Sequence, residues 1–147
     1  EAAAMTTLLD LYEYAEDQGI DVDWVPLEQA TSLSIPLPDG SYAIAVNPWK
    51  LDTLEQETVC LDHELGHCKT GSFYNRHAAL DIRQKHENRA DKWAIQHLIP
   101  VEDLDEAVVE GCEDIPALSE HFCVTEDLMR KAVCWYTHGN LAVEMYA

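Results

Sequence analysis

The stretch His63-Glu64-Leu65-Gly66-His67 decides the fold of this 147-residue chain. Its two histidines are four positions apart, so on a helix they share one face, where both imidazoles can reach a single metal ion. The carboxylate of Glu64 follows the first histidine directly. This combination is typical of zinc hydrolases, in which the histidines bind the metal and the glutamate acts as general base.

The residues around this motif predict the helix that it needs. Thr53 and Gln56 form a capping-box pattern, which satisfies the first free amides of a helix. No proline interrupts the run from Thr53 to Lys69, and Gly71 supplies a stop just beyond it. Val59 shares the face of the two histidines. The residues expected to face a core are Leu54, Leu61, Leu65 and Cys68.

A third metal ligand must come from elsewhere in the chain, because a catalytic zinc usually takes three protein ligands. We predict Glu87, which belongs to a second helical run from Asp81 to Leu98. His86 and His77 are competing candidates for the same position. A different interpretation treats the acidic residues of this run as a solvated helix face, which is where most such charges lie.

Asp91 follows Glu87 by one helical turn and so lies on the same face. A metal-bound histidine normally donates its other ring N–H to a carboxylate or carbonyl, which fixes the tautomer. We therefore expect Asp91 to accept this hydrogen bond, from His63. On the same helix Ala90 and Ala94 are small enough to let the two helices approach each other.

Three further stretches extend the motif: Glu87-x-x-Ala90-Asp91-x-Trp93-Ala94, then His97-Leu98-Ile99-Pro100, then the segment from Ala117 to Thr125. With the HELGH sequence they resemble the ImmA/IrrE family of zinc-dependent peptidases, over roughly positions 42 to 138. The resemblance implies a mostly helical, zincin-like domain of the gluzincin type. It also implies that His63, His67 and Glu87 bind Zn²⁺.

The same resemblance implies a regulatory role. Some members of the family cleave a helix-turn-helix repressor encoded by a phage or mobile element, and we expect such a repressor as the protein substrate. The residues alone indicate only a metal-dependent hydrolase. One alternative is a non-catalytic module that binds a repressor or acts as a toxin-like partner, with a structural or vestigial metal site. Another is a zinc hydrolase of small amides.

The charge balance limits the classes of partner. Nine Lys and Arg stand against 28 Asp and Glu, for a formal net charge of −19. Direct nucleic-acid binding is disfavoured, because it draws on clustered basic residues. A basic protein partner or substrate is more compatible, although the acidity could also serve solubility alone. No apolar run approaches the length of a membrane span, so we expect no membrane partner.

We expect one domain, residues 5–147, with Glu1 to Ala4 as a remnant added before Met5. Five cysteines are present, an odd number without a C-x-x-C pair. No basic, apolar and cleavable leader precedes the domain. These features predict a reduced, cytoplasmic setting.

The N-terminal part predicts a helix and a small sheet. Helical spacing of apolar residues covers 6–18, and alternation of apolar and polar residues covers 20–24. The stretches 32–37 and 42–46 flank a Pro-Asp-Gly turn signal and predict an antiparallel hairpin. We expect its last strand to lie near the metal helix, where a free edge could bind an extended peptide or serve structure alone. The fold class is therefore α+β, a mostly helical domain with a small antiparallel sheet.

Residues 70–80 read as a loop near the cleft. Tyr74 or His77 in this loop could stabilise an oxyanion, although an aromatic residue in a loop more often serves packing.

Three short helices are predicted after Pro100, at 103–110, 115–122 and 126–137. The last two could suggest a DNA-reading motif, but their acidic side chains oppose that function. We predict that they close the core behind the metal helices.

Overall fold

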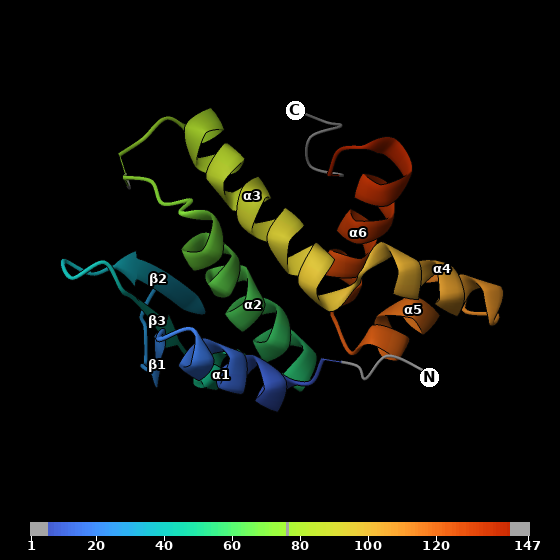
Figure 1. Ribbon diagram of the computed structural model, residues 1–147, viewed down its shortest axis with the longest axis horizontal. Helices are drawn as coiled ribbons and strands as arrows, with labels where there is room; N and C mark the ends of the chain where they lie inside the picture. The colour runs from blue at the N-terminus through green and yellow to red at the C-terminus, as the bar shows by residue number, and fades with distance from the viewer. Residues whose placement is uncertain (1–5, 76, 142–147) are drawn as a thin grey trace.

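The computed structural model describes residues 6–75 and 77–141, and Figure 1 shows how their helices and strands are arranged. In chain order the elements are α1 Leu8–Asp17, β1 Asp21–Trp24, β2 Ser32–Pro36, β3 Tyr42–Val46, the 3₁₀ helix Pro48–Lys50, α2 Leu54–Thr70, α3 Leu80–Leu98, α4 Val101–Val109, α5 Ile115–Phe122 and α6 Glu126–His138. A mostly helical body with one small sheet confirms the predicted α+β class.

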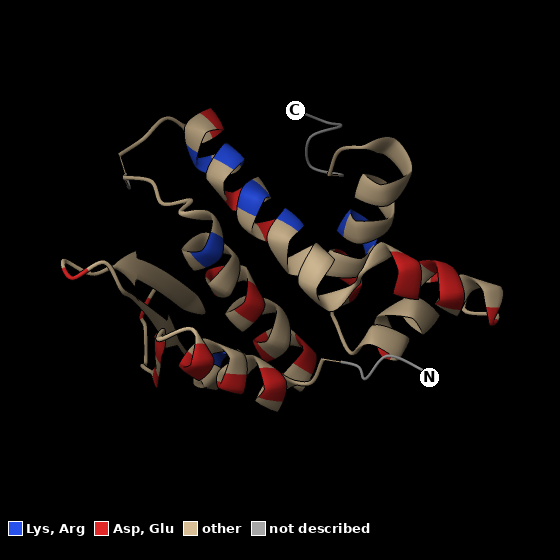
Figure 2. Cartoon of the chain, viewed as in Figure 1, with Lys and Arg blue, Asp and Glu red and all other residues tan. Residues whose placement is uncertain are grey.

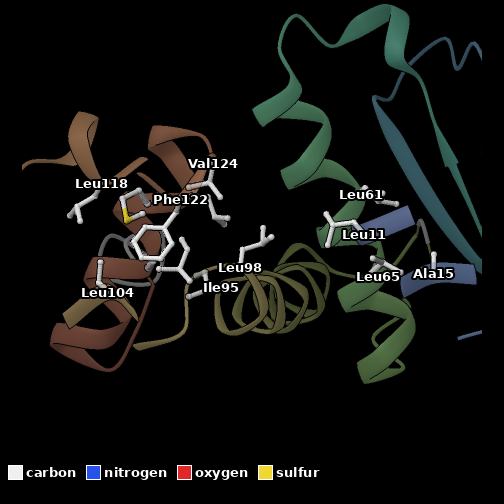
Figure 3. Close-up of a cluster of buried hydrophobic side chains, with 14 of the residues drawn as sticks. Leu11, Ala15, Leu61, Leu65, Ile95, Leu98, Leu104, Leu118, Phe122 and Val124 are labelled. Carbon is white, nitrogen blue, oxygen red and sulfur yellow. The ribbon is translucent and has the colours of Figure 1, made fainter. Parts of the chain in front are cut away.

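The long helix α2 separates the sheet from the rest of the helical body. The sheet and α1 pack on one side of α2, α3 runs beside its other side, and α4 to α6 follow beyond α3 (Figure 1). Figure 3 shows buried side chains on both sides of α3. One group lies between α1 and α2: Leu11, Ala15, Leu61 and Leu65. The other joins α3 to the C-terminal helices: Ile95, Leu98, Leu104, Leu118, Phe122 and Val124.

The sheet is mixed, which corrects the wholly antiparallel sheet predicted from the sequence. The predicted hairpin exists, because β2 and β3 pair antiparallel with Ser34 opposite Ile44. β1 pairs in parallel with the other edge of β3, with Val22 beside Ile44, and the strand order is β1-β3-β2. The reason is the connection 25–31, which carries the chain across to the far edge before the hairpin turns back.

This order also corrects the strand expected to offer a free edge near the metal helix. The sequence predicts a free edge on the last strand, Tyr42–Val46, but β3 is central and uses both edges for pairing. Among the described residues β2 pairs on one side only, and it lies against α2. β3 does contact α2 as expected, but a strand paired on both edges cannot accept another, so the free edge belongs to β2.

The ends of α2 follow the predicted signals with one difference. The Thr53 hydroxyl accepts a hydrogen bond from the Gln56 amide at 3.1 Å, and Gly71 ends the helix in the left-handed conformation. The Gln56 side chain instead accepts from the amide of Asp52, at 2.7 Å. Leu54, expected to face the core, is instead 69% exposed at the first residue of the helix. The other three predicted core residues of α2 are buried.

The contact between α2 and α3 depends on Gly66 and Ala90. A Cβ atom added to Gly66 would lie 2.6 Å from the backbone oxygen of Ala90, and Ala90 and Ala94 are completely buried. The backbones therefore touch directly at this point. The close approach predicted from the two alanines is confirmed, and the glycine inside the motif is the residue that permits it.

The C-terminal helices agree with the predicted ranges except at the start of α4. This helix begins at Val101, two residues earlier than expected, directly after Pro100. Proline suits a helix start because its missing N–H has no partner to lose there. Asp114 and Thr125 cap α5 and α6 as predicted. The buried apolar side chains of these two helices pack behind α3. No helix in the described ranges combines the length and apolarity needed to cross a membrane.

Replacing Gly66 with alanine tests the backbone contact. Alanine ordinarily stabilises a helix interior by about 1 kcal/mol relative to glycine. Here the added methyl meets a backbone atom that cannot rotate away, so we expect a net loss of about 1–3 kcal/mol in the free energy of unfolding. Urea denaturation measures it. Leu54→Ala, on the exposed end of the same helix, should change it by less than about 0.5 kcal/mol. A more stable Gly66→Ala variant would contradict the close contact.

Candidate metal centre

The structure brings together the three residues predicted from the sequence as metal ligands. His63 and His67 lie one turn apart on α2, and Glu87 reaches them from α3. One candidate ligand atom from each residue falls within 4.8 Å of the others. The Nε2 atoms of the two histidines are 3.2 Å apart. The Glu87 carboxylate spans them, with 2.9 Å to His63 Nε2 and 2.8 Å to His67 Nε2.

The second ring nitrogen of each histidine has its own hydrogen-bond acceptor. His63 Nδ1 lies 2.7 Å from Oδ1 of Asp91, and His67 Nδ1 donates to the backbone carbonyl of Ser72, just after the helix ends. These acceptors hold the rings so that both Nε2 atoms point to Glu87. Orientation of this kind leaves Nε2 available as a metal ligand.

The remaining candidates lie at different distances from this cluster. His86 is outside it and faces Tyr74 instead, with ring centroids 6.0 Å apart. His77 is exposed and does not line the hollows described below. Tyr74 does line one of them, together with Glu64 and Glu87. Of the residues nominated as third ligands, the structure therefore gathers only Glu87 with the two histidines of the motif.

Charge coupling shifts the pKa values of all three clustered residues. Burial disfavours the charged form of His63, but hydrogen bonds to Asp91 and Glu87 outweigh it and raise its pKa to about 10. Burial lowers the pKa of His67, but its bonds to Glu87 and to the Ser72 carbonyl, with the charge of Glu87, together raise it. Burial of Glu87 opposes ionisation, yet bonds from both imidazoles hold its pKa far below the usual range. Before a metal binds, the Glu87 carboxylate is therefore paired with the protonated imidazole of His63.

Two serines that were not predicted from the sequence as site residues hold the carboxylate of Glu64. The hydroxyl of Ser32 donates to one carboxylate oxygen at 2.8 Å, and that of Ser34 donates to the other at 2.7 Å. Both serines belong to β2, and Glu64 is buried. The spacing of the two serines places them on the same side of a strand, because residues two apart face the same way. The sequence alone does not show that this side of β2 faces α2.

Two hollows flank the cluster, and both are lined by Ser32, Glu64 and Glu87. One continues past His67 towards the loop that follows α2, where its lining includes Ser72, Phe73 and Tyr74. The other continues past His63 towards the segment before β2, where its lining includes Ala30, Val59 and Cys60. The cleft therefore passes along β2 on both sides of the cluster, and the carboxylate of Glu64 is accessible from either half.

Comparison with known families agrees with this geometry. The family model of Peptidase M78, described as an IrrE N-terminal-like domain, matches residues 15–133, which include every element from β1 to α5. The chain belongs to the Peptidase M78 family. The predicted resemblance to the ImmA/IrrE peptidases is thereby confirmed. No curated protein matches the sequence significantly.

Membership of Peptidase M78 supports a metallopeptidase type of function with a protein substrate. The cluster of His63, His67 and Glu87 is a group that could hold the metal such a function needs. Its donor atoms are two imidazole nitrogens and a carboxylate, and all three side chains converge from the helix pair α2 and α3.

Metal binding to this cluster should release protons. Histidine binds a metal only as the neutral imidazole, whereas the raised pKa of about 10 keeps His63 protonated at pH 7. Glu87 contributes no proton, because its lowered pKa keeps it ionised. We expect about one proton or more released per metal at pH 7, and apparent affinity that rises with pH until His63 deprotonates. Titration calorimetry with Zn²⁺ in two buffers of different ionisation enthalpy measures the release.

A histidine outside the cluster provides the control for this titration. His97 of α3 also has a raised pKa, because its bond to Asp62 of α2 and the charge of that carboxylate together outweigh its burial, but His97 lies outside the cluster. His97→Gln should leave the number of protons released unchanged. Equal heats in the two buffers would show that no proton is displaced, which would contradict the charge state assigned to His63.

Proposed function

We propose that this protein is a zinc-dependent peptidase whose metal is held by His63, His67 and Glu87. The observation that carries the proposal is the convergence of these three side chains, with both Nδ1 atoms engaged elsewhere. Two imidazoles and one carboxylate form a donor set that zinc takes in catalytic sites, where a fourth position stays open. When bound, zinc supplies Lewis acidity, which makes water more acidic and polarises the scissile carbonyl.

Glu64 is the proposed general base. It lies in the cleft beside the cluster, and hydroxyls of Ser32 and Ser34 fix both of its carboxylate oxygens. It takes a proton from the attacking water and passes it to the leaving amine. The two serines orient this carboxylate, so the strand that borders the cleft also positions the base.

Tyr74 is the proposed oxyanion stabiliser. It lines the same half of the cleft as Glu64 and His67. Burial, followed by the charge of Glu87 and a hydrogen bond to it, raises the pKa of the Tyr74 hydroxyl. The phenol therefore keeps its proton at neutral pH and remains a hydrogen-bond donor, as stabilisation of a developing negative charge requires. His77, the other candidate, does not line either half of the cleft.

The edge of β2 is the proposed binding site for the peptide chain. An extended peptide can add to an unpaired strand edge through main-chain hydrogen bonds, and both halves of the cleft follow β2. Leu33 and Ile35 are partly exposed on this strand and offer apolar contacts. A substrate seated there would pass directly over Glu64.

A regulatory substrate, a helix-turn-helix repressor of a phage or mobile element, remains part of the proposal. The family resemblance supports it, and so does the net charge of −19, since an acidic protein attracts a basic partner. Figure 2 shows acidic residues along α1, the start of α2 and α4. The proposed compartment is the cytoplasm. None of the five cysteines, all of which lie in the described ranges, forms a disulfide, as expected in a reducing compartment.

Metal content tests the ligand set. We expect about one zinc per chain in the wild type and little in His63→Ala or Glu87→Ala, because each variant removes one of only three protein ligands. His86→Ala provides the matched control, since it alters a histidine next to Glu87 that lies outside the cluster. Plasma emission spectrometry after dialysis measures the content. Zinc retained in Glu87→Ala but lost in His86→Ala would move the third ligand to His86.

Glu64→Gln tests catalysis separately from binding. The zinc-loaded protein is incubated with a proteome-derived peptide library, and new N-termini are identified by mass spectrometry. We expect cleavage by the wild type and a loss of at least about 100-fold in Glu64→Gln, because a general base contributes 10²–10⁴-fold. Zinc content should stay unchanged. No cleavage by the zinc-loaded wild type, of the library or of a dipeptide, would favour a non-catalytic binding module. Turnover of dipeptides alone would favour a hydrolase of small amides.

A further inference from the structure

Lys131 on α6 reaches the hydrogen-bond partner of a proposed metal ligand. Its Nζ donates to Oδ2 of Asp91 at 2.9 Å, while Oδ1 of the same carboxylate lies 2.7 Å from Nδ1 of His63. The carboxylate is thus held at both oxygens, by α6 on one side and by α2 on the other. Three helices meet in this chain of contacts, which ends at the nitrogen opposite the metal-facing Nε2.

The environment of the Lys131–Asp91 pair differs from that of an ordinary surface ion pair. The side chain of Asp91 is 10% exposed and that of Lys131 is 29% exposed. The neighbouring pair, Arg130 with Asp127, has exposures of 55% and 91%. Exposed pairs contribute little, because water and salt screen them and both side chains lose freedom. A pair shielded from water is screened much less by salt, so its attraction is stronger.

We propose that Lys131 is a positioning residue for the metal centre, which keeps Asp91 Oδ1 directed at His63 Nδ1 and thereby keeps His63 Nε2 directed at the metal. This inference rests on the proposed role of His63 as a ligand. It extends the site beyond α2 and α3. The C-terminal helices, predicted only to close the core, then contribute one side chain to the metal centre.

Two effects of Lys131 on metal affinity have opposite signs. Its positive charge repels a nearby cation, so removing it would strengthen metal binding if charge alone mattered. Its hydrogen bond orients Asp91, so removing it would weaken metal binding if position matters more. Partners behind a metal ligand typically change affinity by 10–100-fold. The direction of the change in a charge-removing variant therefore distinguishes positioning from simple electrostatics.

The test compares the zinc affinity of wild type, Lys131→Met and Lys131→Arg by competition with a chromophoric chelator. We expect Lys131→Met to bind zinc about tenfold more weakly. Lys131→Arg should restore affinity, since arginine can also donate to Oδ2. Arg130→Met removes a charge at the adjacent position without touching Asp91, and should bind as the wild type does. Equal or tighter binding by Lys131→Met would overturn the proposal.

A second readout reports the position of the His63 ring itself. In the zinc-loaded wild type, ¹⁵N-labelled histidine should give an Nδ1–H signal for His63 that is protected from exchange with water. Lys131→Met should broaden or lose this signal, and Lys131→Arg should keep it. Thermal unfolding of the metal-free chains identifies variants that do not fold. If Lys131→Met is among them, Lys131→Gln is measured in its place with the same expectations.

The outcomes separate this inference from the proposed function. A wild type that binds zinc through His63 but gives the same affinity and the same Nδ1–H signal in Lys131→Met overturns the role of Lys131 alone. A wild type that binds no zinc, or binds it equally well in His63→Ala, overturns the proposed function and this inference with it.

Discussion

The whole site depends on how closely α3 can approach α2. Glu87 must come within hydrogen-bonding distance of two imidazoles on a different helix, and a side chain between the backbones would hold it away. Gly66 removes that obstacle, because its missing Cβ is the space that the backbone of Ala90 occupies. The glycine of the HELGH sequence thus serves packing, while its neighbours serve chemistry. Both demands are met within a single turn of helix.

Electrostatics makes this packing consistent with the burial of several charges. Glu64, His67 and Asp91 are buried, and each has complementary partners. Glu64 accepts from two hydroxyls, and His67 bonds a backbone carbonyl and a carboxylate. Asp91 bonds a histidine and a lysine. Unpaired charges in such positions would cost several kcal/mol each. The interlocking pairs remove most of that cost. They also leave few alternative arrangements, so the side chains are already oriented before a metal arrives.

The sequence predicted those parts of the site that depend on local geometry. Spacing of three or four residues places His63 with His67 and Glu87 with Asp91 on helix faces, and capping residues mark where the helices begin. The site residues that the sequence did not predict are placed by contacts between segments far apart in the chain. Ser32 and Ser34 face Glu64 only because β2 takes the edge of a mixed sheet, and Lys131 reaches Asp91 only because α6 packs on α3. The prediction of a free edge on the last strand was wrong for the same reason, because the strand order depends on such distant pairing.

The order in which the chain is synthesised gives the arrangement a further consequence. The three proposed ligands lie within 63–87, on two helices that are consecutive in the chain. Bringing them together closes a shorter stretch of chain than pairing Asp91 with Lys131, and so costs less loop entropy. Lys131 leaves the ribosome more than forty residues after Glu87, as the numbering shows. A nascent chain can therefore collect its ligand set before the lysine that steadies Asp91 exists, and the arrival of α6 completes a centre already assembled.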